Sequence, residues 1–197
     1  TDFKKKFPKS DVSFLPSFHE NEVITAKTGK GNFLLYHGKL SVPENELAAE
    51  FLIENVFSKI KYKVKIAGMD PSKNILHLAS SVPNIELIAN PDEKEMKNLI
   101  SEAQVHCLYT HQNTGLKLKL LNVLFQGRHV LVNKNMTHGT TLGSACHYAE
   151  HPEEWCHAIE RLMKTEFTKE EISKRGNILE DYSNAKQIEK LISVMRD

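Results

Sequence analysis

Two lysines occupy the start of a strongly apolar segment, T-G-L-K-L-K-L-L-N-V-L-F, which covers residues 114–125. From Leu116 to Phe125 most side chains are apolar, and this pattern predicts a helix that is buried on both faces. The start of a helix carries unpaired N–H groups and partial positive charge, so cations there are unfavourable unless an anion lies between them. Lys117 and Lys119 therefore predict a bound anion, and a phosphate group is a natural partner for lysine.

The residues before the lysines fit this prediction. Thr114 is expected to be the N-cap of the helix, which would place Gly115, Leu116 and Lys117 in its first turn with their amides toward a ligand. A glycine in that turn lets a substrate approach the backbone closely. The alternative, which the pattern leaves equally open, is that Lys117 and Lys119 extend into solvent and that Thr114 only caps the helix.

A second tract, A-C-H-Y-A-E-H-P-E-E-W-C-H at residues 145–157, is rich in possible zinc ligands. The candidates are Cys146, His147, His151, Cys156 and His157. Their spacings do not form the paired C-x-x-C units of a closed structural zinc site, and the side chains would point to different faces of a strand and a helix. We therefore expect no metal site, with the histidines at the surface or satisfied in the core.

Other catalytic or cofactor motifs are weak. A hydrolase is poorly supported, because no G-x-S-x-G turn occurs and Cys107 lies within a predicted strand, where a buried inert thiol is expected. Two spaced glycines occur in T-G-K-G-N, residues 28–32, but a dinucleotide fingerprint needs a strand before its glycines, and this motif precedes the first predicted strand. We interpret it as a turn and expect no cofactor.

Strands and helices must alternate to position these residues. Short apolar runs predict strands at 33–38, 63–68, 85–89, 105–109 and 129–133, with a further short strand at 146–149. Helical patterns fall at 43–60, 71–80, 92–103, 116–125, 152–164, 168–181 and 183–195. Alternation through short loops is typical of βαβ units, and apolar strands favour a parallel sheet covered on both faces. The predicted fold is α/β, a Rossmann-like, doubly wound parallel sheet of about six strands.

In such a sheet, ligands bind at the carboxyl ends of the strands, where loops and helix starts gather. The predicted loops at that edge are residues 37–43, 89–93 and 110–115. The helix that begins with the two lysines starts at the same edge. A local anion site is therefore expected there.

The composition limits the partners. The 26 Lys and Arg residues nearly balance the 25 Asp and Glu residues, which argues against a general nucleic-acid or membrane-coating surface. Three cysteines without a disulfide spacing favour a reducing compartment. No apolar run approaches the roughly 20 residues of a membrane helix. We expect a cytoplasmic protein with no nucleic-acid partner and no transmembrane segment.

The motifs at the ligand edge resemble those of the nucleotide-sugar-binding half of the group 1, family 4-like glycosyltransferases, which have the two-domain GT-B fold. One subgroup of that family writes its turn as T-G-I-K-x-K, which residues 114–119 resemble closely. The family's G-R-L after the first strand, whose basic residue meets the diphosphate, is similar to Gly38-Lys39-Leu40. Its second basic residue falls at Glu44 or Asn45 here, so the resemblance assigns that role to Lys117 or Lys119.

The resemblance also implies further contacts with the donor. The loop that contacts the nucleotide base, mainly through its backbone, matches Ile88, Ala89 and Asn90. Two glutamates of the family, near the donor sugar and the ribose, are replaced by Thr114 and Asn122. Asparagine can still bond a ribose hydroxyl, and threonine can do so more weakly.

On this resemblance the chain is the C-terminal half of a GT-B hexosyltransferase that retains configuration, with mannosyl transfer and polysaccharide biosynthesis as the family setting. It would bind a UDP- or GDP-linked sugar, with Lys39, Lys117 and Lys119 stabilising the leaving diphosphate. Residues 1–31 would connect to a missing N-terminal acceptor domain, 32–182 would form the donor-binding domain, and 183–197 a C-terminal helix. The missing half could attach the protein peripherally to the inner membrane face.

Two alternatives stay open at this stage. The first is a non-catalytic nucleotide-binding or scaffold domain, because both family glutamates are absent. The second is an epimerase or phosphorylase with the same two-domain architecture. Turnover of a nucleotide sugar by the full-length protein would distinguish an enzyme from a scaffold, and a 2-epimer or a sugar phosphate as product would favour the second alternative.

Overall fold

The computed structural model describes residues 2–10 and 12–196, and its centre is a single six-stranded parallel sheet. The strands are β1 (Leu34–His37), β2 (Val64–Gly68), β3 (Ile85–Ala89), β4 (Val105–Leu108), β5 (His129–Val132) and β6 (His147–Tyr148). Their spatial order is β3-β2-β1-β4-β5-β6. The predicted α/β fold class, a doubly wound parallel sheet of about six strands, is confirmed.

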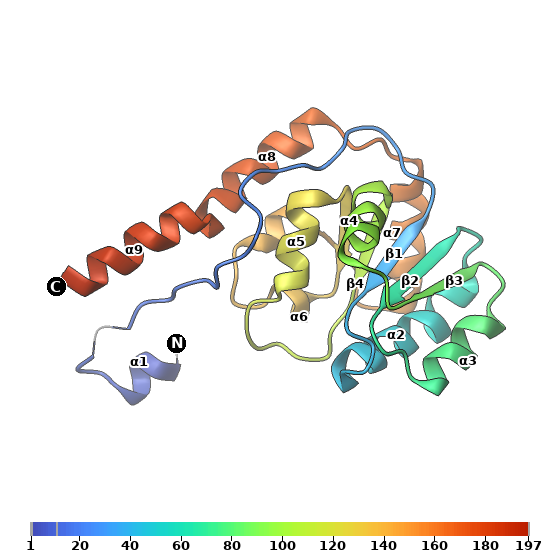
Figure 1. The fold of residues 1–197 in the computed structure, drawn as a ribbon, viewed down its shortest axis with the longest axis horizontal. Helices are drawn as coiled ribbons and strands as arrows, with labels where there is room; N and C mark the ends of the chain where they lie inside the picture. The colour runs from blue at the N-terminus through green and yellow to red at the C-terminus, as the bar shows by residue number, and fades with distance from the viewer. Residues whose placement is uncertain (1, 11, 197) are drawn as a thin grey trace.

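Helices connect the strands and continue beyond the last one (Figure 1). They are α2 (Pro43–Asn55), α3 (Lys73–Ser81), α4 (Glu93–Glu102), α5 (Leu118–Gln126), α6 (Lys134–Thr137), α7 (Pro152–Lys164), α8 (Lys169–Leu179) and α9 (Asn184–Arg196). Short 3-10 turns are η1 (Phe57–Lys59), η2 (Leu142–Ala145) and η3 (Glu180–Tyr182). A further short helix, α1 (Asp2–Lys6), lies in the N-terminal segment and was not predicted.

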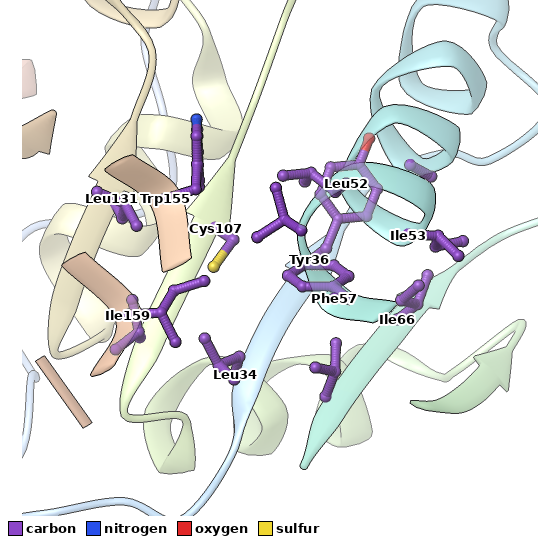
Figure 2. Close-up of a cluster of buried hydrophobic side chains, with 14 of the residues drawn as sticks. Leu34, Tyr36, Leu52, Ile53, Phe57, Ile66, Cys107, Leu131, Trp155 and Ile159 are labelled. Carbon is purple, nitrogen blue, oxygen red and sulfur yellow. The ribbon is translucent and has the colours of Figure 1, made fainter. Parts of the chain in front are cut away.

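Two apolar cores form, one on each face of the sheet, because alternate side chains of a strand point to opposite faces. Leu34 and Tyr36 of β1 pack with α2, α3 and α7, and Figure 2 shows this core around Leu52 and Trp155. Leu35 packs on the other face with α4, α5 and α8. Both kinds of position on β1 are fully buried, which explains why the strand sequences are continuously apolar.

The strand order places the switch in chain direction between β1 and β4, which are neighbours in the sheet. The chain moves outward from β1 to β3, crosses back to β4 and then moves outward in the other direction. The loops after β1 and β4 therefore diverge from each other, and this divergence opens a crevice at the carboxyl edge. Two of the three predicted ligand loops, 37–43 and 110–115, flank this crevice.

The N-terminal segment and α9 extend from the same side of the α/β body (Figure 1). The segment is attached to the body by its backbone, because the amide of Thr25 donates to the carbonyl oxygen of Phe125. Asn184 Nδ2 donates to the carbonyl oxygen of His19 and so joins the segment to α9. Residues 1, 11 and 197 of the two predicted terminal segments lie outside the described residues, and the predicted boundaries at 31 and 182 stay predictions. No described helix is long and apolar enough to cross a membrane.

Candidate functional site

A cavity of about 420 Å³ opens beside the β1–β4 crevice, at the carboxyl edge of the sheet. It has the size of a small-ligand site. Its walls include Gly38 and Lys39 after β1, Gly68 and Met69 after β2, Pro91 and Met96 at the start of α4, and Asn122 of α5. Three of the sequence-predicted site residues, Gly38, Lys39 and Asn122, are therefore brought together in one cavity.

Asn122 faces this cavity but is also tied to the N-terminal segment. Its Oδ1 accepts a hydrogen bond from Asn21 Nδ2 at 2.8 Å, and Asn21 Oδ1 accepts one from Gln126 Nε2 at 2.7 Å. Within the described part of the chain, Asn122 Nδ2 has no hydrogen-bond partner. Its N–H donors are therefore available to a hydroxyl of a ligand, while its oxygen holds the segment in place.

Lys119 points into the fold and not into solvent. Its Nζ donates to Asn45 Oδ1 at 2.8 Å and lies 5.6 Å from the centre of the Tyr36 ring. Burial lowers the pKa of Lys119 to about 8, although the Glu44 carboxylate partly opposes this shift. Lys119 thus crosses from α5 to the first turn of α2, to one of the two positions where the resemblance places a second basic residue.

The other two lysines at this edge have different surroundings. Lys117 Nζ bonds the carbonyl oxygen of Thr114, so the charge of Lys117 is held against its own loop. Lys39 is exposed and lines the cavity. The solvent alternative for the lysines of residues 117–119 is therefore excluded for Lys119 in this structure, while Lys117 is engaged locally.

The predicted helix start is wrong, because the observed N-cap lies three residues after Thr114. Helix α5 begins at Leu118 with Lys117 as its N-cap, and no side chain caps it. Gly115 has a φ of +73°, a left-handed conformation that a right-handed helix excludes, so the chain reverses there and Thr114 is too far upstream to cap. The amides of Gly115 and Leu116 consequently precede the first turn. A Cβ at Gly115 would meet no atom within 4 Å, so this loop is open to an approaching ligand.

Glu44 supplies an internal anion that the sequence did not reveal. Its Oε1 accepts hydrogen bonds from the amides of His111 at 2.7 Å and Gln112 at 3.2 Å, and from the Thr110 hydroxyl. Burial alone would raise the pKa of Glu44, but these three bonds lower it below its usual value. The carboxylate therefore joins the first turn of α2 to the loop after β4 and places a negative charge beside Lys119.

The third predicted loop, residues 89–93, follows β3 and lines the cavity through Pro91, Asp92 and Glu93. Asn90 has a φ of 53°, and its Oδ1 accepts from the amide of Asp70 at 2.8 Å. Ala89 and Asn90 are exposed, and Ile88 is half-buried against the core. Pro91, directly after them, forms the cavity wall. The three predicted base-contacting residues therefore lie beside the cavity and not in its wall.

His37, the last residue of β1, is a further member of the site that sequence reasoning missed. It is buried, it lines the cavity, and its Nδ1 has no hydrogen-bond partner among the described residues. Burial first and the charge of Lys119 second lower the pKa of His37 to about 4. The imidazole is therefore neutral near pH 7. An apolar run that ends in histidine before G-K-L was the signal available in the sequence.

No family model and no curated protein matches this chain. Its fold matches TarM of S. aureus, a mutant solved with fondaparinux, alpha-GlcNAc-glycerol and UDP, with a TM-score of 0.70, 14% identity and coverage of 100% of this chain and 42% of TarM. It also matches a glycosyltransferase from Rickettsia africae, with a TM-score of 0.62, 12% identity and coverage of 98% and 50%.

A third match is trehalose-6-phosphate synthase, described in a study of glycosyl transfer with retention, with a TM-score of 0.64, 10% identity and coverage of 85% of this chain and 45% of that protein. The chain thus spans about half the length of the structures it matches. The fold is that of one GT-B domain. This agrees with the architecture that the resemblance implied, and at these identities the matches concern the fold alone.

Proposed function

We propose that this chain binds the donor of a glycosyltransferase, a nucleoside-diphosphate sugar, at the carboxyl ends of β1, β3 and β4. The observation that carries the proposal is the meeting of Gly38, Lys39 and Asn122 in one cavity at the β1–β4 crevice. In a doubly wound sheet this is the position at which ligands bind. That TarM was solved with UDP supports a uridine nucleotide as the first ligand to test.

The nucleoside would occupy the cavity. Met69, Pro91 and Met96 give it an apolar surface against which a base can lie. Asn122 of α5 lines the same cavity, and its Nδ2 can donate a hydrogen bond to a ribose hydroxyl. This arrangement agrees with the ribose role that the resemblance assigns to Asn122, while the base would be held by the residues around Asn90.

The diphosphate would lie between Lys39 and the open loop at Gly115. Lys119 sits beside that position, already held across the crevice by Asn45. Lys117 would reach the phosphates after releasing the carbonyl oxygen of Thr114. When the bond between the sugar and the phosphate oxygen breaks, its electron pair leaves with the diphosphate, and these cations stabilise the developing charge. The oxygen of the acceptor hydroxyl forms the new bond to the sugar carbon, and its proton passes to the departing diphosphate oxygen.

The transfer is expected to be that of a hexose with retention of configuration, and the acceptor would be held by a second domain. The fold match to trehalose-6-phosphate synthase, whose description names retention, supports this outcome. Thr114 stands where the family has a glutamate near the donor sugar, and it is exposed on the loop before Gly115. Its hydroxyl can contact a sugar hydroxyl, with less strength than a carboxylate.

Calorimetric titration of the 197-residue chain with UDP and with GDP tests the proposal. One of the two should bind saturably with a 1:1 stoichiometry. The variant Asn122→Leu should weaken that binding by roughly 1 kcal/mol or more, because a hydrogen bond to the ribose is lost. The matched control is Asn21→Ala, which removes the partner of Asn122 Oδ1 without altering the cavity wall.

The outcomes separate the roles of Asn122. If Asn21→Ala weakens nucleotide binding as much as Asn122→Leu does, Asn122 serves only to hold the N-terminal segment. If neither nucleotide binds the wild-type chain, the donor-binding proposal is wrong. Binding without any turnover by a longer protein that contains the acceptor half would favour the scaffold alternative, which the loss of both family glutamates motivates.

A further inference from the structure

Three potential metal ligands from distant parts of the sequence meet beside β5 and β6, in a cavity of about 200 Å³. They are His129 of β5, His147 of β6 and Glu171 in the first turn of α8. One ligand atom from each lies within 4.8 Å of those of the other two. Nothing in the donor-binding proposal uses these residues. His129 is the first residue of β5, so the cluster lies toward the opposite edge of the sheet from the nucleotide cavity.

The two ring nitrogens of His129 cannot both form a hydrogen bond with the oxygen atoms that they face. Its Nε2 lies 3.2 Å from the carbonyl oxygen of Thr165, and its Nδ1 lies 3.5 Å from Glu171 Oε1. Both ring nitrogens therefore face oxygen atoms that only accept hydrogen bonds. A neutral imidazole carries one proton, so one of its nitrogens must present a lone pair to an oxygen. The side chain of His129 is only 1% exposed.

The Thr165 carbonyl determines which ring nitrogen of His129 carries the proton. It is the closer acceptor and fixes the proton on Nε2, so Nδ1 turns its lone pair toward Glu171. A backbone carbonyl that holds the other ring N–H is the usual partner of a metal-binding histidine. Nδ1 is also buried, and it has no hydrogen-bond partner in the described chain. The lone pair of a buried nitrogen without a hydrogen-bond partner is thus directed at a carboxylate.

Glu171 is placed for the same role by the start of α8. Its Oε2 accepts from the amide of Thr168 at 2.9 Å in a capping box, which leaves Oε1 directed toward His129. Two ligands about 2.1 Å from a tetrahedral zinc ion are roughly 3.4 Å apart. The 3.5 Å separation of His129 Nδ1 and Glu171 Oε1 matches that value. His147 is half-buried, so a small shift of its ring can complete the set.

We propose that His129, His147 and Glu171 bind a divalent transition metal of the zinc class, which joins α8 to β5 and β6. Two imidazole nitrogens and one carboxylate suit zinc and not the hard ions magnesium and calcium. The metal would satisfy the Nδ1 lone pair and the Glu171 charge together. The role is structural, because the cluster is remote from the nucleotide cavity.

The electrostatics of the surroundings act in both directions. The positive charges of Arg161 and Arg175 act on both histidines. The same arginines repel a cation. Arg175 is engaged elsewhere, since its guanidinium donates to the carbonyl oxygens of Leu124, Gly127 and Arg128. These carbonyl dipoles offset part of its charge, and Glu171 offsets more.

The test is a titration of the untagged 197-residue chain, stripped with a chelator, with Zn²⁺ and separately with Mg²⁺. We expect one Zn²⁺ per chain, a rise in the melting temperature with Zn²⁺, and no response to Mg²⁺. His147→Ala removes a half-buried ligand and should weaken Zn²⁺ binding at least about tenfold. Glu171→Gln keeps a side chain that can close the capping box and should weaken it as well.

His157→Ala is the matched control, because His157 is an exposed histidine on α7, outside this cavity. Its affinity for Zn²⁺ should equal that of the wild type. The proposal is overturned if wild type binds no Zn²⁺, or if both ligand variants bind it as tightly as His157→Ala does. Glu171→Gln decides the question should His147→Ala fail to fold. Nucleotide binding is measured separately, so either proposal can fail without the other.

Discussion

Lys119 differs from the other lysines at the β1–β4 edge because the fold has already removed it from water. The pKa of about 8 follows from burial, and the hydrogen bond to Asn45 holds the amine in place. A bound diphosphate would stabilise the protonated form of the Lys119 amine, which burial disfavours. Lys119→Gln should therefore weaken the binding of UDP by about 1–2 kcal/mol and reduce its dependence on salt. Calorimetry at two salt concentrations measures both effects.

The pH dependence of that binding has a definite sign. In the free protein Lys119 loses its proton as the pH rises through about 8, whereas a lysine in the unfolded chain does so near 10.5. A bound phosphate favours the protonated amine, so binding above pH 8 must take up a proton and the affinity of the wild type should fall there. The affinity of Lys119→Gln should not change over the same range. Lys117→Gln is the control and should keep the pH dependence of the wild type. If the pH dependence is lost in Lys117→Gln and kept in Lys119→Gln, the effect belongs to Lys117 and the prediction is wrong.

The residues of the site could be predicted only in part. The family resemblance assigned Gly38, Lys39 and Asn122 to the donor site, and the structure brings these three residues to one cavity. Glu44 was noted only as a position where the family has a basic residue. Its role was not foreseen, because its partners, the amides of His111 and Gln112, are 67 and 68 positions away. His37 was missed because a burial-lowered pKa depends on neighbours that only the fold supplies.

At the scale of elements, Glu44 is the residue that joins α2 to the loop after β4. Its carboxylate bonds two amides and one hydroxyl of that loop. Glu44→Ala should destabilise the chain by about 1–3 kcal/mol, because hydrogen bonds to a charged acceptor are lost. Amide hydrogen exchange at His111 and Gln112 should become faster, since the loop is released from α2.

Glu46→Ala is the matched control for this prediction. Glu46 also lies in the first turn of α2, where the helix dipole favours a carboxylate, but it makes no side-chain hydrogen bond that the structure describes. Exchange at His111 and Gln112 should be unchanged in that variant. Equal exchange in the two variants would mean that the helix dipole, and not the Glu44 bridge, orders the loop.

The boundaries of the elements show where sequence patterns stop being informative. The β3 strand was predicted with its exact limits, because turn residues flank it on both sides. The start of α5 was misplaced, since apolar residues continue upstream of the helix and hide the reversal at Gly115. Gly127, after α5, has a φ of −99° and is not a left-handed cap. It is required for space, because a Cβ there would lie 2.2 Å from His106 Nε2.

At the scale of the whole molecule, the sheet order explains why the ligand edge could be foreseen. Alternating elements restrict the chain to a parallel sheet with right-handed connections, and such a sheet has its crevice where the winding reverses. The order itself was not readable from the sequence, because the six strands have similar apolar composition. It depends on which helices pack on which face, and the two cores record that outcome.

The N-terminal segment and α9 carry apolar side chains that the α/β body does not cover. Apolar side chains stay exposed on α9 and on the N-terminal segment, including Phe14, Phe18, Ile192 and Met195, of which Met195 is 77% exposed. These two elements extend from the same side of the α/β body (Figure 1). An apolar surface of this kind marks a site where another protein surface packs. On the donor-binding proposal, the acceptor-binding half would pack against this surface.

The 197-residue chain alone should therefore bind a nucleotide sugar without transferring its sugar. Catalysis needs the acceptor hydroxyl held within reach of the donor, and this chain supplies one wall of such a cleft. The measurement is release of UDP or GDP from a panel of nucleotide sugars, with and without candidate acceptors, by this chain and by a longer protein that includes the second half. Only the longer protein should release the nucleotide above the protein-free control. Transfer by the 197-residue chain alone would show that its own residues position the acceptor, and the second half would then have no part in catalysis.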